Sequence, residues 1–72
     1  MKKYFINKNR QESYDGNHNE VHEEGCYWLE KARDVEDLGY HYSCKGAMIV
    51  VLEHYPNTAD GCKKCCYECH TG

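Results

Sequence analysis

The clearest hydrophobic pattern in the chain lies between Ser43 and Pro56. Apolar side chains recur there at steps of three and four residues, which is the period of one helical face. These side chains are Cys44, Ala47, Met48, Val51, Leu52 and Tyr55. Ser43 is a good N-cap, and Pro56 cannot continue a helical hydrogen-bond ladder. The pattern therefore predicts one main helix over about residues 44–54. Ile49 and Val50 lie off the stripe, so this helix is either covered on two sides or in contact with a partner.

Two other stretches have the pattern of strands. Residues 2–7 combine aromatic and β-branched side chains, and residues 38–42 alternate aromatic with other side chains at a period of two. Residues 21–29 are expected to form a strand or a tight turn. Residues 7–20 are rich in asparagine and glycine and have no apolar period, so they are expected to be a flexible loop. The pattern predicts a small α+β domain with two or three short antiparallel strands.

The length of the chain indicates that this fold needs a cross-link. Its 72 residues allow a single domain, 1–72, and a core of that size rarely supplies more than about 3–5 kcal/mol of stability. Six cysteines indicate either bound metal or disulfides. The apolar run after Met1 is much shorter than the roughly 7–15 residues of a signal peptide. We therefore expect a cytoplasmic protein whose reduced cysteines bind metal. The longest apolar run, 47–52, is far below the roughly 20 residues of a membrane helix, so no membrane association is expected.

Two pairs of candidate metal ligands bracket the middle of the chain. His22 and Cys26 form an H-x3-C pair, and Cys62 and Cys65 form a C-x2-C pair. Tetrahedral zinc takes cysteine sulfur and histidine nitrogen, and short spacings let two ligands from one turn reach the same ion. A glycine precedes both Cys26 and Cys62, and glycine allows a tight turn to pass close to a metal. We predict one Zn²⁺ bound by all four residues, in a closed site typical of structural zinc.

The cysteine-rich tail leaves several alternatives open. Cys66 and Cys69 form a second C-x2-C, and His70 follows them. A tail cysteine could replace one of the four ligands, the tail could hold a second zinc with His18 or His70, or Cys66 and Cys69 could be a redox pair. Cys66, Cys69, His70 and His18 are therefore reserve ligands. Cys44 is expected to be a small buried hydrophobe on the predicted helix.

The order of these motifs resembles the Ada-type zinc-binding domain. In that family an early ligand pair precedes a strand, a helix and a C-x2-C pair. The matching parts of this chain are His22 with Cys26, residues 38–40, the helix that carries Ala47, and residues 61–65. The end of the chain, Cys69-His70-Thr71, is also similar to the CHT-like tail of short uncharacterised bacterial proteins. The resemblance covers roughly residues 21–65 and implies a small zinc-binding domain.

One ligand departs from the DNA-repair members of that family. There the first ligand is a cysteine whose metal-activated thiolate accepts a methyl group from a DNA phosphotriester. Here His22 stands at that position, and zinc-bound imidazole has no comparable nucleophile. The formal charge of -3, with nine basic and twelve acidic side chains, also disfavours binding to nucleic acid. Neither methyl transfer nor DNA binding is the expected function.

These observations favour a non-enzymatic zinc-binding domain that acts as an interaction module, with a protein partner or with a second copy. Tyr40, Tyr42 and the wide apolar helix are the candidate contact surfaces. The first alternative is a cysteine-thiolate enzyme, either a methyl acceptor or a thiol–disulfide redox protein, that acts through Cys65, Cys66 or Cys69. The second alternative is a nucleic-acid-binding domain.

Overall fold

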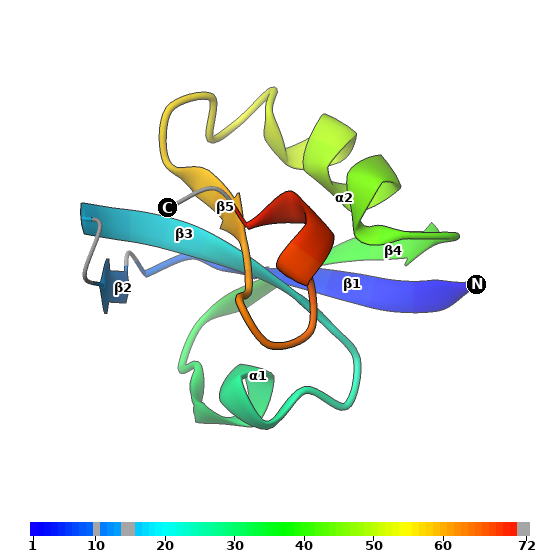
Figure 1. The fold of residues 1–72 in the computed structure, drawn as a ribbon, viewed down its shortest axis with the longest axis horizontal. Helices are drawn as coiled ribbons and strands as arrows, with labels where there is room; N and C mark the ends of the chain where they lie inside the picture. Colours follow the sequence, from blue (N-terminus) through cyan, green and yellow to red (C-terminus); the bar gives the residue numbers. More distant parts are fainter. Residues whose placement is uncertain (10, 14–15, 71–72) are drawn as a thin grey trace.

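A computed structural model describes residues 1–9, 11–13 and 16–70 as an α+β domain with a mixed sheet and two short helices (Figure 1). The strands are β1 (Lys2–Asn7), β2 (Gln11–Ser13), β3 (Gly16–Glu23), β4 (Val35–His41) and β5 (Ala59–Gly61). The helices are α1 (Tyr27–Lys31), α2 (Cys44–Val51) and the 3₁₀ turn η1 (Tyr67–Cys69). In Figure 1, α2 lies above the crossing strands and α1 lies below them. The α+β class predicted from the sequence is thus confirmed.

The register of the sheet positions the candidate ligands. Strand β1 pairs antiparallel with β3 and with β4, while β2 pairs antiparallel with the start of β3. Strand β5 runs parallel to β3, with Val21 opposite Gly61. The Cys62 amide then donates a hydrogen bond of 2.9 Å to the Val21 carbonyl. This register brings the chain segment that begins at Cys62 beside His22.

The strand content exceeds the two or three antiparallel strands predicted from the sequence. The described part of the chain has five strands, and one of them is parallel. Much of the stretch 7–20, predicted to be a loop, forms β2 and the first part of β3, which pair as a hairpin. Nothing in the sequence indicated this hairpin, because its residues do not alternate between apolar and polar. That alternation is expected only where one face of a strand covers the core. Residues 10, 14 and 15 of that predicted loop lie outside the described residues.

Helix α2 follows the pattern predicted from the sequence. Ser43 is the N-cap, and its Oγ accepts a hydrogen bond of 3.3 Å from the Lys45 amide. Ala47 and Val51 are buried against the sheet, whereas Ile49 and Val50 are exposed. The helix ends at Val51 rather than near 54, because the next residues form a turn whose amides bond back to the Val51 carbonyl. No helix in the described ranges is long and apolar enough to cross a membrane.

Residues 21–29 form the end of β3, a turn and the start of α1. Gly25 has a φ of 85° in this turn, a conformation that glycine adopts without strain. Tyr27 and Trp28 are 59% and 50% exposed, whereas Leu29 packs against the core. The short α1 has no fully buried residue, and its two aromatic side chains face the solvent.

Sulfur makes up much of the small core. The buried apolar side chains are Tyr4, Ile6, Val21, Cys26, Leu38, Cys44, Ala47, Val51, Cys62 and Cys66. Four of these ten are cysteines, so thiol chemistry and core packing are coupled in this fold.

Candidate metal centre

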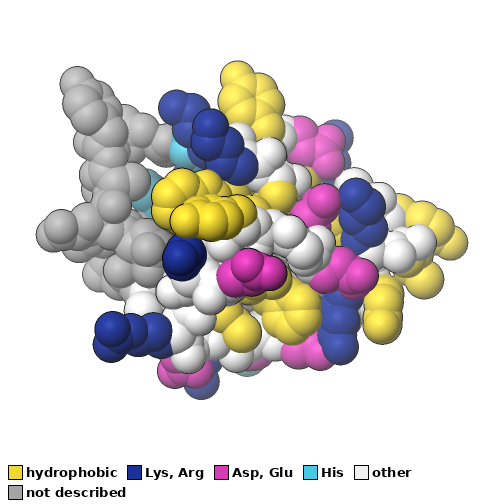
Figure 2. Space-filling view, turned by 90° about the horizontal axis from the view of Figure 1, so that it is seen from below, with side chains coloured by type: hydrophobic (Ala, Val, Ile, Leu, Met, Phe, Trp, Pro, Cys, Tyr) yellow, Lys and Arg dark blue, Asp and Glu magenta, His cyan; other side chains and the backbone are white. Residues whose placement is uncertain are grey.

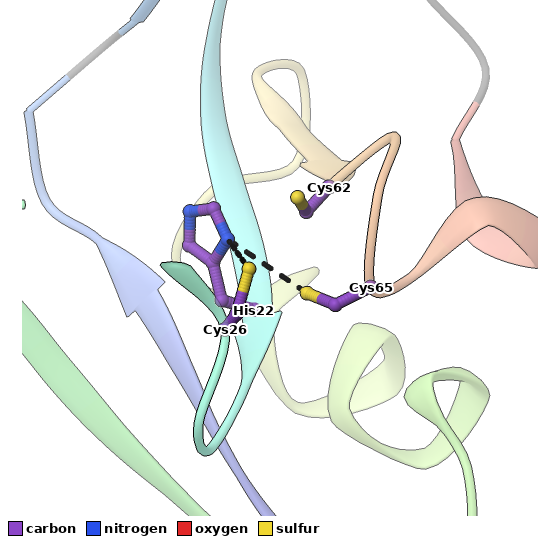
Figure 3. Close-up of side chains that lie close together, drawn as sticks. All are labelled: His22, Cys26, Cys62 and Cys65. Carbon is purple, nitrogen blue, oxygen red and sulfur yellow. Dashed lines mark hydrogen bonds between the residues drawn. The ribbon is translucent and has the colours of Figure 1, made fainter. Parts of the chain in front are cut away.

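The structure brings His22, Cys26, Cys62 and Cys65 together from four different places in the fold (Figure 3). His22 lies near the end of β3, and Cys26 lies at the N-cap of α1. Cys62 directly follows β5, and Cys65 lies in the next turn. One ligand atom from each residue lies within 4.8 Å of the other three. The four residues predicted as ligands therefore form a group that could hold a metal ion such as zinc.

The distances within this group fit a tetrahedral ion. His22 Nδ1 lies 3.7 Å from Cys26 Sγ and 3.9 Å from Cys65 Sγ. Zinc bonds of about 2.0–2.1 Å to nitrogen and about 2.3 Å to sulfur place tetrahedral ligands roughly 3.5–3.8 Å apart. These two distances are close to that range, and since all the ligand atoms lie within 4.8 Å of one another, binding an ion would shorten any separation by at most about 1 Å.

Backbone amides support two of the sulfurs. The Glu23 amide donates a hydrogen bond of 3.3 Å to Cys65 Sγ, and the Lys64 amide donates one of 3.4 Å to Cys62 Sγ. Such donors stabilise a thiolate more than a neutral thiol. These two hydrogen bonds therefore favour the thiolate form of Cys62 and Cys65, which is the form that binds a cation.

Burial governs the ionisation of the group when no cation is bound. Burial lowers the pKa of His22, so its imidazole is neutral and can use a nitrogen lone pair. Burial raises the pKa of Cys26, and it raises the pKa of Cys62 to about 12. The pKa of Cys65 is also raised, first by its hydrogen bond with Cys66 and then by burial. A divalent cation reverses this balance, because thiolates are the form that binds metal.

Glu20 lies outside the ligand group but contacts it. Its Oε1 is 3.7 Å from His22 Nε2, the ring nitrogen opposite the one that faces the sulfurs. A carboxylate on the far side of a histidine ligand orients the ring. Sequence reasoning missed this residue. The available signal was its spacing, because residues two apart on a strand share a face.

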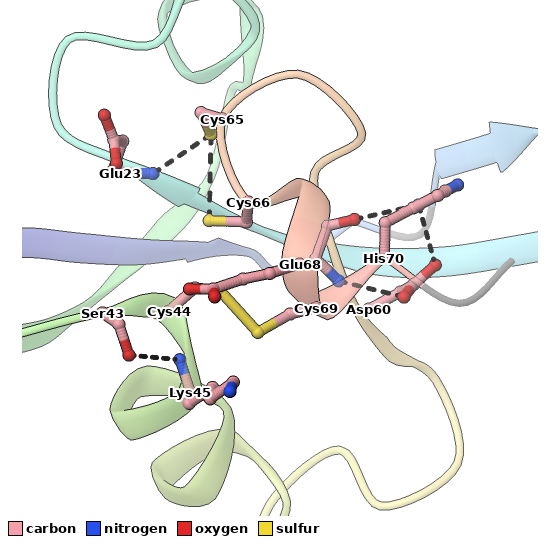
Figure 4. Close-up of a disulfide and its surroundings, with 11 residues drawn as sticks. Glu23, Ser43, Cys44, Lys45, Asp60, Cys65, Cys66, Glu68, Cys69 and His70 are labelled. Atoms are coloured by element: carbon pink, nitrogen blue, oxygen red, sulfur yellow. Dashed lines mark hydrogen bonds and ion pairs between the residues drawn. A yellow bond between two sulfur atoms is a disulfide. The ribbon is translucent and has the colours of Figure 1, made fainter.

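The tail cysteines and histidines take other positions. Cys69 forms a disulfide with Cys44, so neither sulfur is a free thiol in this structure (Figure 4). Cys44 is buried on the helix, as predicted, but it is also cross-linked. The pair Cys66–Cys69, suggested as a redox pair, is therefore not the one that is bonded. Cys66 is a free buried thiol whose Sγ lies 3.9 Å from Cys65 Sγ. The expectation of fully reduced cysteines is also wrong for the bonded pair.

The two reserve histidines are not in the ligand group. His70 Nδ1 lies 3.1 Å from the Gly61 carbonyl and 3.4 Å from the Asp60 carboxylate (Figure 4). His18 Nε2 is buried and has no hydrogen-bond partner among the described residues. Thr71, in the predicted CHT-like tail, lies outside the described residues.

Comparison with known proteins did not identify a relative of this chain. No family model matches the sequence, and neither a curated protein nor a solved structure matches it. The resemblance to the Ada-type domain therefore rests on its motifs alone. The structure itself supports a small cysteine-rich α+β domain with a Cys/His cluster that could bind a metal.

Proposed function

We propose that this chain is a non-enzymatic zinc-binding domain that acts as an interaction module. The observation that carries the proposal is the closed ligand group, in which one imidazole and three thiols converge. Protein atoms would fill all four positions of a tetrahedral zinc, whereas catalytic zinc keeps one position for water or substrate. Such a site supplies folding energy, on the order of 10–16 kcal/mol of apparent binding free energy at neutral pH.

The alternative enzymes receive less support from the same geometry. In the methyl acceptors of the Ada-type family that this chain resembles, the reactive thiolate stands at the position that His22 holds here. A redox pair at Cys66 and Cys69 is disfavoured, because Cys69 is bonded elsewhere and Cys66 is 1% exposed. The net negative charge gives nucleic acid little attraction.

Exposed aromatic and aliphatic side chains support the interaction half of the proposal. Tyr42 is 91% exposed and Ile49 is 71% exposed, and Tyr40 and Trp28 are also at the surface. Tyrosine and tryptophan are enriched in protein interfaces. Figure 2 looks onto the side that carries α1, and there hydrophobic side chains lie among charged ones of both signs. This mixed surface suits another protein better than a polyanion.

Thiol accessibility tests the structural role of the zinc. The zinc-loaded protein is treated with an alkylating reagent under native conditions, and the modified cysteines are identified by mass spectrometry. We expect Cys26, Cys62 and Cys65 to be protected while zinc is bound and to react after chelation. Alkylation of one of these cysteines with zinc retained would support the thiolate-enzyme alternative and contradict a closed structural site.

Self-association can be measured without knowing a partner. Sedimentation equilibrium of the zinc-loaded chain would be compared with that of Tyr42→Ser, whose side chain is almost fully exposed. Association that weakens in the variant supports a second copy as the partner. A monomer over the whole concentration range contradicts self-association and leaves another protein as the proposed partner.

A further inference from the structure

A second group of ligand atoms lies where η1 meets the start of α2. Cys44 is the first residue of α2, and Glu68 and Cys69 belong to η1. The two sulfurs and a carboxylate oxygen of Glu68 all lie within 4.8 Å of one another. Cys44 Sγ is 3.3 Å from Glu68 Oε1. None of these three residues belongs to the His22 group.

The chemistry of this second group depends on its oxidation state. In the structure the two sulfurs are joined as a disulfide (Figure 4). A disulfide offers a metal no thiolate, whereas reduction would give two thiols beside a carboxylate. Cysteine sulfur and carboxylate oxygen are both ligands of Zn²⁺. We propose that reduction of the Cys44–Cys69 disulfide creates a second zinc site with Glu68 as the third ligand, so that the bond and the metal exclude each other.

The balance of the reaction needs an external two-electron reductant. A dithiol would break the S–S bond, become a disulfide itself and leave two protonated thiols on Cys44 and Cys69. Zn²⁺ then replaces the two thiol protons, which go to solvent, and no further electrons are transferred. Reoxidation by a disulfide-containing oxidant takes the two electrons back and releases the zinc.

The backbone positions of Cys44 and Cys69 are compatible with both the disulfide and the zinc-bound state. The Cα atoms of Cys44 and Cys69 are 6.6 Å apart, near the upper end of the roughly 4.4–6.8 Å seen for disulfides. Two sulfurs on one tetrahedral zinc lie about 3.8 Å apart, a separation that side-chain rotation can supply. Cys44 is buried, whereas Glu68 is exposed. The ion would therefore lie at the surface, with a fourth position open to water.

The proposal does not depend on the function proposed for the His22 group, and zinc stoichiometry separates the two. Native mass spectrometry would be carried out with zinc supplied, first on the disulfide form and then under anaerobic conditions with a phosphine. The phosphine is chosen because dithiols themselves chelate zinc. It takes up the oxygen of one water as it reduces the bond to two thiols. We expect one zinc in the disulfide form and two in the reduced form.

Two variants assign the second ion. Glu68→Gln should weaken binding of the second zinc at least about tenfold and leave the first unchanged, while the matched control Glu53→Gln, an exposed carboxylate outside both groups, should behave as wild type. Cys44→Ser should bind one zinc under reducing conditions. If Cys44→Ser does not fold, Glu68→Gln decides the question, because its side chain is exposed. One zinc in the reduced wild type, or equal second-zinc binding in Glu68→Gln, would overturn the proposal.

Discussion

Gly25 and Gly61 each precede a ligand cysteine, but the backbone needs them for different reasons. Gly25 has a φ of 85°, and a Cβ there would meet nothing within 4 Å. At Gly61 the conformation is ordinary, but a Cβ would lie 2.6 Å from the Cys66 carbonyl oxygen and 2.8 Å from Cys69 Cβ. The first glycine serves backbone conformation, and the second allows β5 to pass close to the tail.

Substitution separates these two roles. Gly61→Ala should lower the free energy of unfolding by about 1–3 kcal/mol, because the atoms it would meet are mostly backbone and must shift. The control Gly25→Asn should cost less, because asparagine tolerates a positive φ. Urea unfolding of the zinc-loaded proteins measures both. Equal costs for the two variants would mean that the close approach at Gly61 is relaxed in solution.

The raised thiol pKa values predict a proton release on metal binding. The pKa of Cys26, Cys62 and Cys65 is raised above the ordinary thiol value, with burial as a cause at each, and that of His22 is lowered by burial. The folded metal-free protein thus carries three thiol protons at pH 7 and none on His22. Zinc binding should release about three protons, and still about three at pH 9, since the thiols remain protonated there.

Calorimetric zinc titration in buffers of different ionisation enthalpy counts these protons. The same pKa shifts also determine how the stability of the metal-free protein changes with pH. Raised thiol pKa values mean that the folded metal-free state binds more protons than the unfolded state above about pH 8.5, so its stability falls as pH rises through that range. A release that drops towards half at pH 9 would show that the metal-free thiols are not buried.

Among the elements, β3 shows how a polar strand can lie at the centre of a fold. Asn19 is 3% exposed, and its Nδ2 donates hydrogen bonds of 3.1 Å to the carbonyls of Asn7 and Lys8. Its Oδ1 accepts a hydrogen bond from Thr58 Oγ1. One amide side chain thereby joins the end of β1 to the turn before β5. These bonds satisfy polar groups that the burial of β3 would otherwise leave without partners.

Removal of that amide should weaken the sheet. Asn19→Ala removes the hydrogen bonds to the buried Asn7 carbonyl, to the Lys8 carbonyl and from the Thr58 hydroxyl, so we expect a loss of about 2 kcal/mol in the free energy of unfolding. The control Asn57→Ala removes an exposed asparagine from the turn that precedes β5 and should change little. Thermal or urea unfolding compares the two variants. Similar stability for both would show that water replaces the bonds of Asn19.

Elements with a regular apolar period were predictable, and those without one were not. The residues of α2 repeat at helical steps, and β1 carries the composition of a strand, so both followed from local sequence. The hairpin of β2 and the first part of β3 could not be predicted in this way, because its two strands pair through backbone groups and their sequence has few apolar residues. Helix α1 was missed because five residues give too little period to recognise.

At the scale of the whole molecule, two cross-links converge on one segment. The candidate zinc site ties β3 and the start of α1 to Cys62 and Cys65. The disulfide ties the start of α2 to Cys69. Both links hold the segment that follows β5, which has little regular structure of its own. With zinc bound at that site, we expect the fold to depend on these links more than on the burial of a large apolar core.

The two cross-links should differ in their effect on stability. The double variant Cys44→Ala/Cys69→Ala should lose about 3 kcal/mol, as expected for a link between residues 25 positions apart, yet stay folded with zinc bound. Chelation of the wild-type protein, with the disulfide intact, should lower its melting temperature further than loss of the disulfide does. Circular dichroism with heating measures both. A chelated protein that keeps most of its stability would make the disulfide, rather than the metal, the main cross-link.

The sequence by itself determined the α+β class, the position of α2 and the residues of the candidate metal site. These are local features, because helical period, N-cap and ligand spacing are all contained in short segments. Tertiary structure alone decided that β5 runs parallel to β3 and that Glu20 contacts His22. It also decided that Cys69 pairs with Cys44. Those outcomes depend on which distant segments lie side by side, and no spacing along the chain specifies the partner of a cysteine.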